Sequence, residues 1–244
     1  MVGTLTHRER AIRAVLGLIA AIAAWQLEWP AASGTENIVL SWVAAFIAVA
    51  AIVTAIAGRA PLARIGLDRD GALAVFAARV FVGWEFAYAG SQKVFGAESS
   101  AWVGSNAGDA VTGYLNHAIS APMTSGPFPQ VQGWYADLVS NQFLPRAEFF
   151  SYLVAFGELA AGIALIIGMF TRIAAMGALI MNLAFLLAGT AGVNPLMIVC
   201  DVAVAFAPAA VLYTLGVDRY MLPALHRWWD HSRFHAHPHA GVPA

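Results

Sequence analysis

Hydrophobic residues fill this chain in long blocks that are separated by short polar segments. A helix that crosses the hydrocarbon core of a bilayer needs about 20 apolar residues. Five blocks approach or reach that length, at about residues 38–57, 72–95, 147–170, 173–188 and 196–215, and a shorter sixth block lies at about residues 14–24. The pattern therefore predicts an all-α polytopic membrane protein built as a six-helix transmembrane bundle.

The first block is short and follows basic residues, which is also compatible with a secretory signal. Trp25 and Trp29 come directly after it, and such a pair is typical of the aromatic belt at a membrane interface. We therefore favour an uncleaved first helix.

The composition agrees with a membrane protein. Hydrophobic residues make up 60% of the 244 positions and charged residues only 11%, whereas soluble domains have about 25% charged residues. The net charge is −1 and no basic patch is present, so we expect the lipid bilayer as the environment and no nucleic acid as a partner.

The basic residues predict the orientation of the bundle. With a cytoplasmic N-terminus, most loop and terminal arginines fall on the cytoplasmic side: Arg8, Arg10, Arg13, Arg59, Arg64, Arg69, Arg172, Arg219, Arg227 and Arg233. The outer side receives only Lys93 and Arg146. This positive-inside pattern predicts a multi-pass protein of the cell inner membrane with both termini cytoplasmic.

Three regions follow from this arrangement. Residues 1–71 would hold two N-terminal transmembrane helices and a cytoplasmic loop, residues 72–215 a four-helix core, and residues 216–244 a cytoplasmic histidine-rich tail. Within the core, residues 97–146 form a long extracytoplasmic loop with helical spacing at 107–119 and 130–143. The second piece has an apolar side, which predicts a helix on the membrane surface or a cap on the bundle: Val131, Trp134, Tyr135 and Leu138.

The helix at residues 72–96 carries the densest set of polar groups. Spacings of four, three, four and three residues place five side chains on one stripe: Arg79, Gly83, Phe86, Gly90 and Lys93. The two glycines would allow a neighbouring helix to approach closely. Glu85 and Gln92 form a second stripe.

Charges at membrane depth are costly, and they are usually paired or functional. Counted from the span ends at about 1.5 Å per residue, Glu158 and Asn182 lie near the depth of Arg79 and would form a buried polar network with it. A second layer would open outward, with Glu85 and Asp201 at similar depth and other polar groups at the outer boundary: Glu28, Gln92, Lys93 and Glu148. These groups either fix the register of the helices or form a polar pocket.

The sequence contains no motif for a resident redox group. Cys200 is the single cysteine, and no histidine falls inside a predicted span. No haem ligands, iron–sulfur cysteines or flavin and nicotinamide glycine motifs are recognisable. The histidine-rich tail matches no structural metal site, so we predict no metal.

Several motifs in order resemble the DoxX family of small bacterial membrane proteins. They are Arg79-x-x-x-Gly83, Gly90-x-x-Lys93, Glu158-x-x-x-Gly162, Gly168-Met-Phe-Thr-Arg172, Asn182-x-x-Phe-Leu-Leu-Ala-Gly and Asn194-Pro195. The resemblance covers about residues 72–215 and is nearest to the DoxD-type membrane subunits of thiosulfate:quinone oxidoreductase. It implies that Arg79, Lys93, Glu158, Arg172 and Asn182 are signature residues.

The resemblance also implies an extracytoplasmic oxidation of thiosulfate, or of a related reduced sulfur compound, with membrane quinone as the electron acceptor. Lys93 would attract the anionic substrate, and Glu85 or Asp201 would handle protons. Gln92, Trp134, Tyr135 and Glu148 are the remaining candidates for the quinone or substrate pocket.

Two other functions stay open. The chain could be a non-catalytic membrane anchor or assembly subunit of a respiratory or redox-stress complex, since a partner protein subunit is expected in either case. A small-solute transporter is less favoured, because no inverted repeat or broken helix pair is visible.

Overall fold

The computed structural model of this protein describes residues 71–213 and 215–234. Every regular element within these residues is helical, and they run in this order: α4 (Ala72–Phe95), α5 (Ser99–Trp102), α6 (Asp109–Ala118), α7 (Ala121–Thr124), α8 (Gly133–Leu138), η1 (Val139–Phe143), η2 (Leu144–Arg146), α9 (Ala147–Ile167), α10 (Thr171–Leu187), α11 (Asn194–Ala205), α12 (Ala209–Leu212) and α13 (Asp218–Phe234). The predictions for residues 1–70, including the first two helices and Glu28, lie outside the described residues, as does the tail beyond residue 234.

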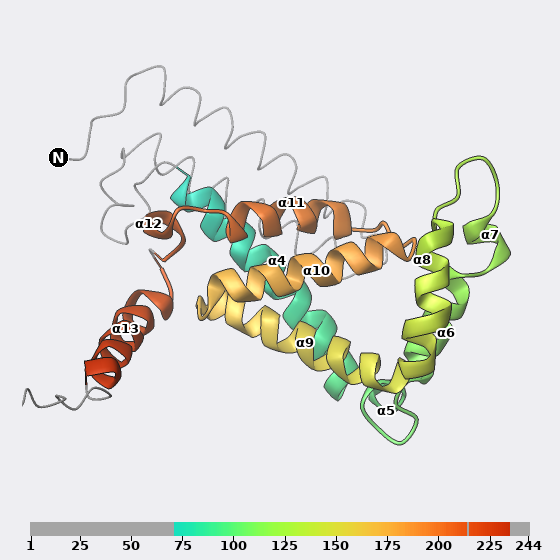
Figure 1. The fold of residues 1–244 in the computed structure, drawn as a ribbon, viewed down its shortest axis with the longest axis horizontal. Coiled ribbons are helices and arrows are strands. Elements are labelled where there is room, and N and C mark those ends of the chain that lie inside the picture. Colours follow the sequence, from blue (N-terminus) through green and yellow to red (C-terminus); the bar gives the residue numbers. More distant parts are fainter. Residues whose placement is uncertain (1–70, 214, 235–244) are drawn as a thin grey trace, which may run out of the picture.

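Four helices form the body of the described structure: α4, α9, α10 and α11 (Figure 1). Their buried side chains make one apolar core, with Phe81, Phe86 and Leu165 among the least exposed. The helices α5 to α8 gather at one end of this body, and α12 and α13 lie at the other (Figure 1). The all-helical prediction and the helix at residues 72–96 are thus confirmed for the described part of the chain.

Glycines allow α4 and α9 to lie against each other. A Cβ atom at Gly90 would collide with the backbone of Leu159, and one at Gly162 would collide with the backbone of Ala87. Partners along α4 and α9 run in opposite directions, so the two helices are antiparallel. The predicted close approach at the glycine stripe is confirmed.

The end of the body near α13 is closed by a carboxylate and two glycines. Asp218 is 1% exposed, and its two oxygens accept hydrogen bonds from the backbone N–H groups of Phe170 and Thr171 at 2.7 and 2.8 Å. This contact satisfies donors at the start of α10, which a helix cannot satisfy internally. Gly168 and Gly216 have positive φ angles of 70° and 142° and contact each other, a backbone conformation that glycine adopts at little steric cost.

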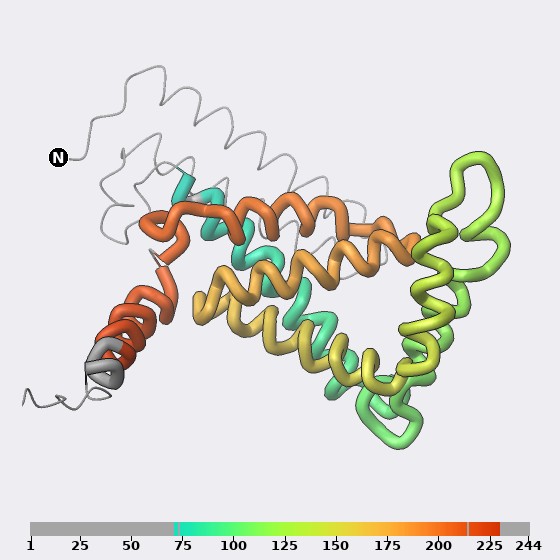
Figure 2. Tube along the Cα trace, viewed as in Figure 1, coloured from blue at the N-terminus to red at the C-terminus, as the bar shows by residue number. Residues whose placement is uncertain are grey.

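The opposite end is capped by the segment that was predicted as a long outer loop. It has its own apolar core, and the two helical pieces are confirmed as α6 and as α8 with η1. On the predicted apolar side, Val131 and Tyr135 are buried against the cap, whereas Trp134 is 60% exposed. The chain stays helical from α8 through η1 and η2 into α9, and its path turns a corner between α8 and α9 (Figure 2).

The described residues contain one helix long and apolar enough to cross a membrane, the 35-residue path Gly133–Ile167, together with the shorter apolar helices α10 and α11. The span predicted at residues 196–215 is wrong as a single helix. The helix α11 ends at Ala205, and Pro208 precedes the separate short helix α12. Proline lacks an N–H donor and disfavours helical geometry in the residue before it, which explains the break.

Replacing Gly162 by alanine tests the α4–α9 contact. The added methyl group would meet the backbone of Ala87, which cannot move without separating the helices, so we expect a loss of thermal stability in detergent equivalent to about 1–3 kcal/mol.

Gly177→Ala is the matched control, because Gly177 lies inside α10 and a Cβ added there would meet open space. Alanine at this position should be neutral or stabilising by about 0.4–1 kcal/mol. Equal melting temperatures for the two variants would contradict the contact.

Candidate functional site

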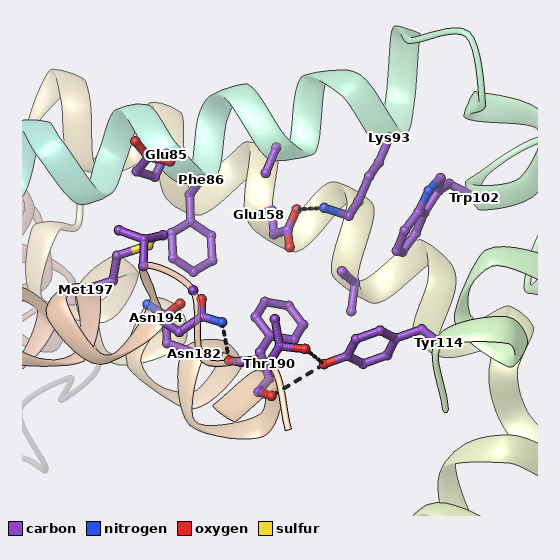
Figure 3. A pocket seen from close by; sticks show the side chains of 15 residues that line it. Glu85, Phe86, Lys93, Trp102, Tyr114, Glu158, Asn182, Thr190, Asn194 and Met197 are labelled. Carbon is purple, nitrogen blue, oxygen red and sulfur yellow. Dashed lines mark hydrogen bonds and ion pairs between the residues drawn. The ribbon is translucent and has the colours of Figure 1, made fainter. Parts of the chain in front are cut away.

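A cavity of about 330 Å³ lies among α4, α9, α10 and α11, near the end capped by α5 and α6 (Figure 3). Small-molecule sites in proteins typically occupy about 300–1,000 Å³ and combine apolar walls with a few polar groups. The walls here are mainly apolar, and the polar and charged side chains that line them are Glu85, Lys93, Tyr114, Glu158, Asn182, Thr190 and Asn194. The cavity is therefore the candidate binding site of the described residues.

Helical spacing directs these side chains into one space. On α4 the cavity is lined by Glu85, Phe86, Ala89 and Lys93. The last three are separated by three and four residues and so share a face. Pairs three or four residues apart on the other helices do the same: Val154 and Glu158 on α9, Asn182 and Phe185 on α10, and Asn194 and Met197 on α11. The local sequence thus explains why each helix presents two or more residues here.

Lys93 and Glu158 form an ion pair in the wall of the cavity. Lys93 Nζ donates a hydrogen bond to Glu158 Oε2 at 2.6 Å, and the two side chains are 18% and 4% exposed. The ammonium group also lies 4.9 Å from the ring centroid of Trp102, within range of a cation–π interaction. The pair faces the cavity in Figure 3, so charge and hydrogen-bonding capacity are available to a ligand.

The predicted pairing of Arg79 with Glu158 is wrong. Arg79 is buried, but its guanidinium donates to the backbone oxygen of Leu215 at 2.5 Å, and Asp218 is the carboxylate whose charge acts on it. The glycine contacts set α4 against α9 so that Glu158 lies beside Lys93. Arg79 is 14 residues earlier on α4, about 21 Å along the helix.

Asn182 also has a different partner from the one predicted. It does not complete an Arg79 network: its Nδ2 donates to Asp201 Oδ2 at 2.7 Å, and both side chains are 1% exposed. Asn182 Oδ1 and Asp201 Oδ1 are buried and have no hydrogen-bond partner among the described residues. Asn182 lines the cavity and holds a buried acceptor, Oδ1, and the hydrogen bond from its Nδ2 to Asp201 fixes the orientation of the amide.

Tyr114 connects the cap to the body. Its hydroxyl is 2.6 Å from Thr190 Oγ1 and 3.4 Å from the backbone oxygen of Phe185. Burial raises the pKa of Tyr114, while the hydrogen bond to Thr190 acts in the opposite direction. The phenol therefore remains protonated at neutral pH and can donate a hydrogen bond.

The other predicted site residues are divided among three places. Glu85 lines the cavity, whereas Arg172 donates to the backbone oxygen of Ala207 at 2.7 Å, away from it. The four remaining pocket candidates are absent from the cavity lining: Gln92, Trp134, Tyr135 and Glu148. Gln92 and Glu148 are exposed, and the Tyr135 hydroxyl donates to the backbone oxygen of Ala184 at 2.9 Å.

Sequence reasoning missed the residues that reach the cavity from the cap and the α10–α11 turn. Trp102 and Tyr114 lie in the loop region, and no periodic signal connects them with α4 or α10. Asn194 was noted only as part of a motif, and its Nδ2 donates to the Thr190 backbone oxygen at 2.8 Å, which shapes the turn beside the cavity. Among the described residues, no group of three or more His, Cys, Asp or Glu side chains could hold a metal ion.

Comparison with known proteins adds a family to this geometry. Residues 74–191 match the model of the DoxX family. This DoxX domain includes α4, the cap, α9 and α10, and so most of the cavity lining. The family is membrane-associated, in agreement with the long apolar helix ending at Ile167. No curated protein and no solved structure gives a significant match to the chain.

A double-mutant cycle tests the ion pair. Lys93→Met leaves the nearly inaccessible Glu158 without its cation, and breaking a buried pair in this way typically costs about 3–5 kcal/mol. Glu158→Gln should cost less, because Lys93 is partly exposed and can be solvated. The double variant should lose less stability than the sum of the single variants, measured as unfolding free energy in detergent.

The control cycle uses Arg79→Met with Glu158→Gln. These side chains make no contact in the structure, so their effects should add to within about 0.5 kcal/mol. If the Arg79 and Glu158 variants were coupled and the Lys93 and Glu158 variants were additive, Arg79 and not Lys93 would be the partner of Glu158.

Proposed function

We propose that this protein is a multi-pass inner-membrane subunit of a quinone-linked oxidoreductase, and that the cavity receives the quinone head group. The observation that carries the proposal is the Lys93–Glu158 ion pair, at 2.6 Å, in the wall of a mainly apolar cavity. A charged pair at such a place is costly unless it is compensated. The oxygens of a quinone gain charge and protons when it is reduced, and an ion pair beside them could stabilise that charge and exchange protons with them.

The polar groups suit the two oxygens of a quinone ring. Lys93 offers N–H donors. Asn182 offers an acceptor, because its amide N–H side faces the Asp201 carboxylate, which only accepts hydrogen bonds when ionised. A carbonyl oxygen would bind at Lys93, and a hydroxyl of the reduced form would satisfy the unpartnered Asn182 Oδ1. Aromatic side chains of Phe86, Trp102 and Phe185 supply apolar contact for a planar ring.

Reduction of a quinone to a hydroquinone takes up two electrons and two protons. Lys93 can stabilise the negative charge that develops on the nearer oxygen and donate a proton to it. Glu158, which is hydrogen-bonded to Lys93, can take up a proton from the cavity and pass it to the neutral amine, so that Lys93 is charged again. Glu85, which lines the same cavity, is the candidate for handling the second proton.

The electron donor we propose is thiosulfate or a related reduced sulfur anion on the extracytoplasmic side. Two thiosulfate ions joined as tetrathionate release two electrons, which balances the reduction of one quinone with two protons. Lys93 lies near the capped end of the body, where its charge would attract an anion. A partner subunit is expected to complete the site, because the sequence offers no motif for a resident redox group.

Binding of a short-chain benzoquinone analogue to the purified protein tests the cavity. We expect Lys93→Gln to weaken the affinity about tenfold or more, because a hydrogen bond from a charged donor contributes about 1.5–3 kcal/mol.

Arg146→Gln is the matched control. Arg146 is also a cation at the capped end, but its side chain bonds only to Gln142 in the described structure and does not line the cavity. Equal weakening in both variants, or no binding to the wild-type protein, would rule out the site.

A non-catalytic anchor or assembly subunit is the second candidate. The observation that favours it is the exposed aromatic surface of the cap, where Phe128 is 93% and Trp134 60% exposed. Aromatic side chains are enriched at protein interfaces. Such a subunit would hold a partner protein and would not need the cavity for electron transfer.

Thiosulfate-dependent quinone reduction distinguishes the two functions. The oxidoreductase predicts activity in the complex purified through this chain, lost in Lys93→Gln and retained in Arg146→Gln. The anchor predicts the same activity in all three complexes, together with loss of the partner when Trp134 is replaced by alanine.

A further inference from the structure

The last described helix, α13, has a strongly two-sided surface. At 100° per residue, five of its apolar residues fall on one side: Met221, Leu222, Leu225, Trp228 and Trp229. The other side holds Arg219, His226, Arg227 and Asp230, together with the aromatic residues Tyr220 and Phe234. The apolar side is accessible, since Leu225 is 43% and Trp228 63% exposed, and no other described helix packs extensively along α13.

The start of α13 is fixed at the end of the membrane-length helix. The backbone N–H groups of Val217 and Asp218 donate to the backbone oxygens of Ile167 and Gly168 at 3.1 and 2.8 Å. Asp218 also holds the first turn of α10. The start of α13 is therefore held at the end of the apolar path Gly133–Ile167.

We propose that α13 lies in the head-group region of the adjacent leaflet, with Leu225 and Trp228 toward the acyl chains and Arg219 and Arg227 toward anionic phosphates. Tryptophan rings concentrate at this depth in membrane proteins. Helices with one apolar and one basic face lie in the plane of the interface, and each basic residue near an anionic surface adds about 1 kcal/mol of attraction. The helix would hold this end of the body at a fixed depth.

Site-directed spin labelling of the full chain tests this placement. Cys200 is the only cysteine, so Leu225→Cys and Trp228→Cys can be made on a Cys200→Ser background, with His226→Cys and Arg227→Cys as matched polar-face positions. Each variant is reconstituted in vesicles of phosphatidylcholine with phosphatidylglycerol. Collision with oxygen, which partitions into lipid, is compared with collision with a water-soluble nickel chelate.

We expect the labels at 225 and 228 to collide mainly with oxygen and the labels at 226 and 227 mainly with nickel. Vesicles of phosphatidylcholine alone should raise the nickel accessibility of the label at 225. Nickel access at all four positions would overturn the proposal, as would low access to both reagents at 225 and 228, which would mean that protein covers this face. Unchanged immersion without phosphatidylglycerol would overturn the role of the arginines.

Discussion

The contact between α4 and α9 determines which groups the buried charges of these two helices meet. Gly90 and Gly162 allow the two backbones to approach until a side chain at either position would collide with the other helix. Without a strong hydrophobic drive between helices in lipid, such close packing is a main source of their association. It also fixes one register, since a shift by one residue would place a Cβ atom where only hydrogen fits. That register brings Lys93 to Glu158.

The same register gives the two basic side chains of α4 different surroundings. At one end, Arg79 lies against Gly168 and Gly216, where a Cβ at Gly168 would be 2.7 Å from Nη1, and it bonds to a backbone oxygen. At the other end, Lys93 and Glu158 border an open cavity. The middle of the α4–α9 contact stays apolar, as the cost of an uncompensated charge requires. Charge is therefore kept where the backbone or a cavity can compensate it.

Much of this arrangement could be predicted from periodicity, and the errors have a common cause. The bounds of α4, the inward stripe from Arg79 to Lys93 and the close approach at its glycines all follow from spacing within one helix. The Arg79–Glu158 pair was wrong because depths counted from the ends of two spans carry no information about the register between them. Gly90 and Gly162, treated as contact points, would have given that register.

Trp102 and Tyr114 could not be found in this way, because they reach the cavity through tertiary folding of a segment without long-range periodicity. Trp134, in contrast, was a candidate for the pocket but does not line the cavity. Its position in the repeat suggested an inward side chain, but the helix α8 is only six residues long and its apolar side is narrower than the repeat implied. Short helices limit what a periodic pattern can determine.

The two buried cations also differ in chemistry, and this difference agrees with their places. Arginine keeps its proton under physiological conditions and holds several donors in a rigid plane, which suits Arg79 as a fixed link to the Leu215 backbone. Lysine is flexible and can release a proton. The chain contains 13 lysine and arginine residues, and Lys93 is the only lysine among them. It lies at the cavity, beside the carboxylate of Glu158. Under the proposed function, a lysine at that place could both bind a quinone oxygen and pass a proton to it, whereas an arginine could only bind it.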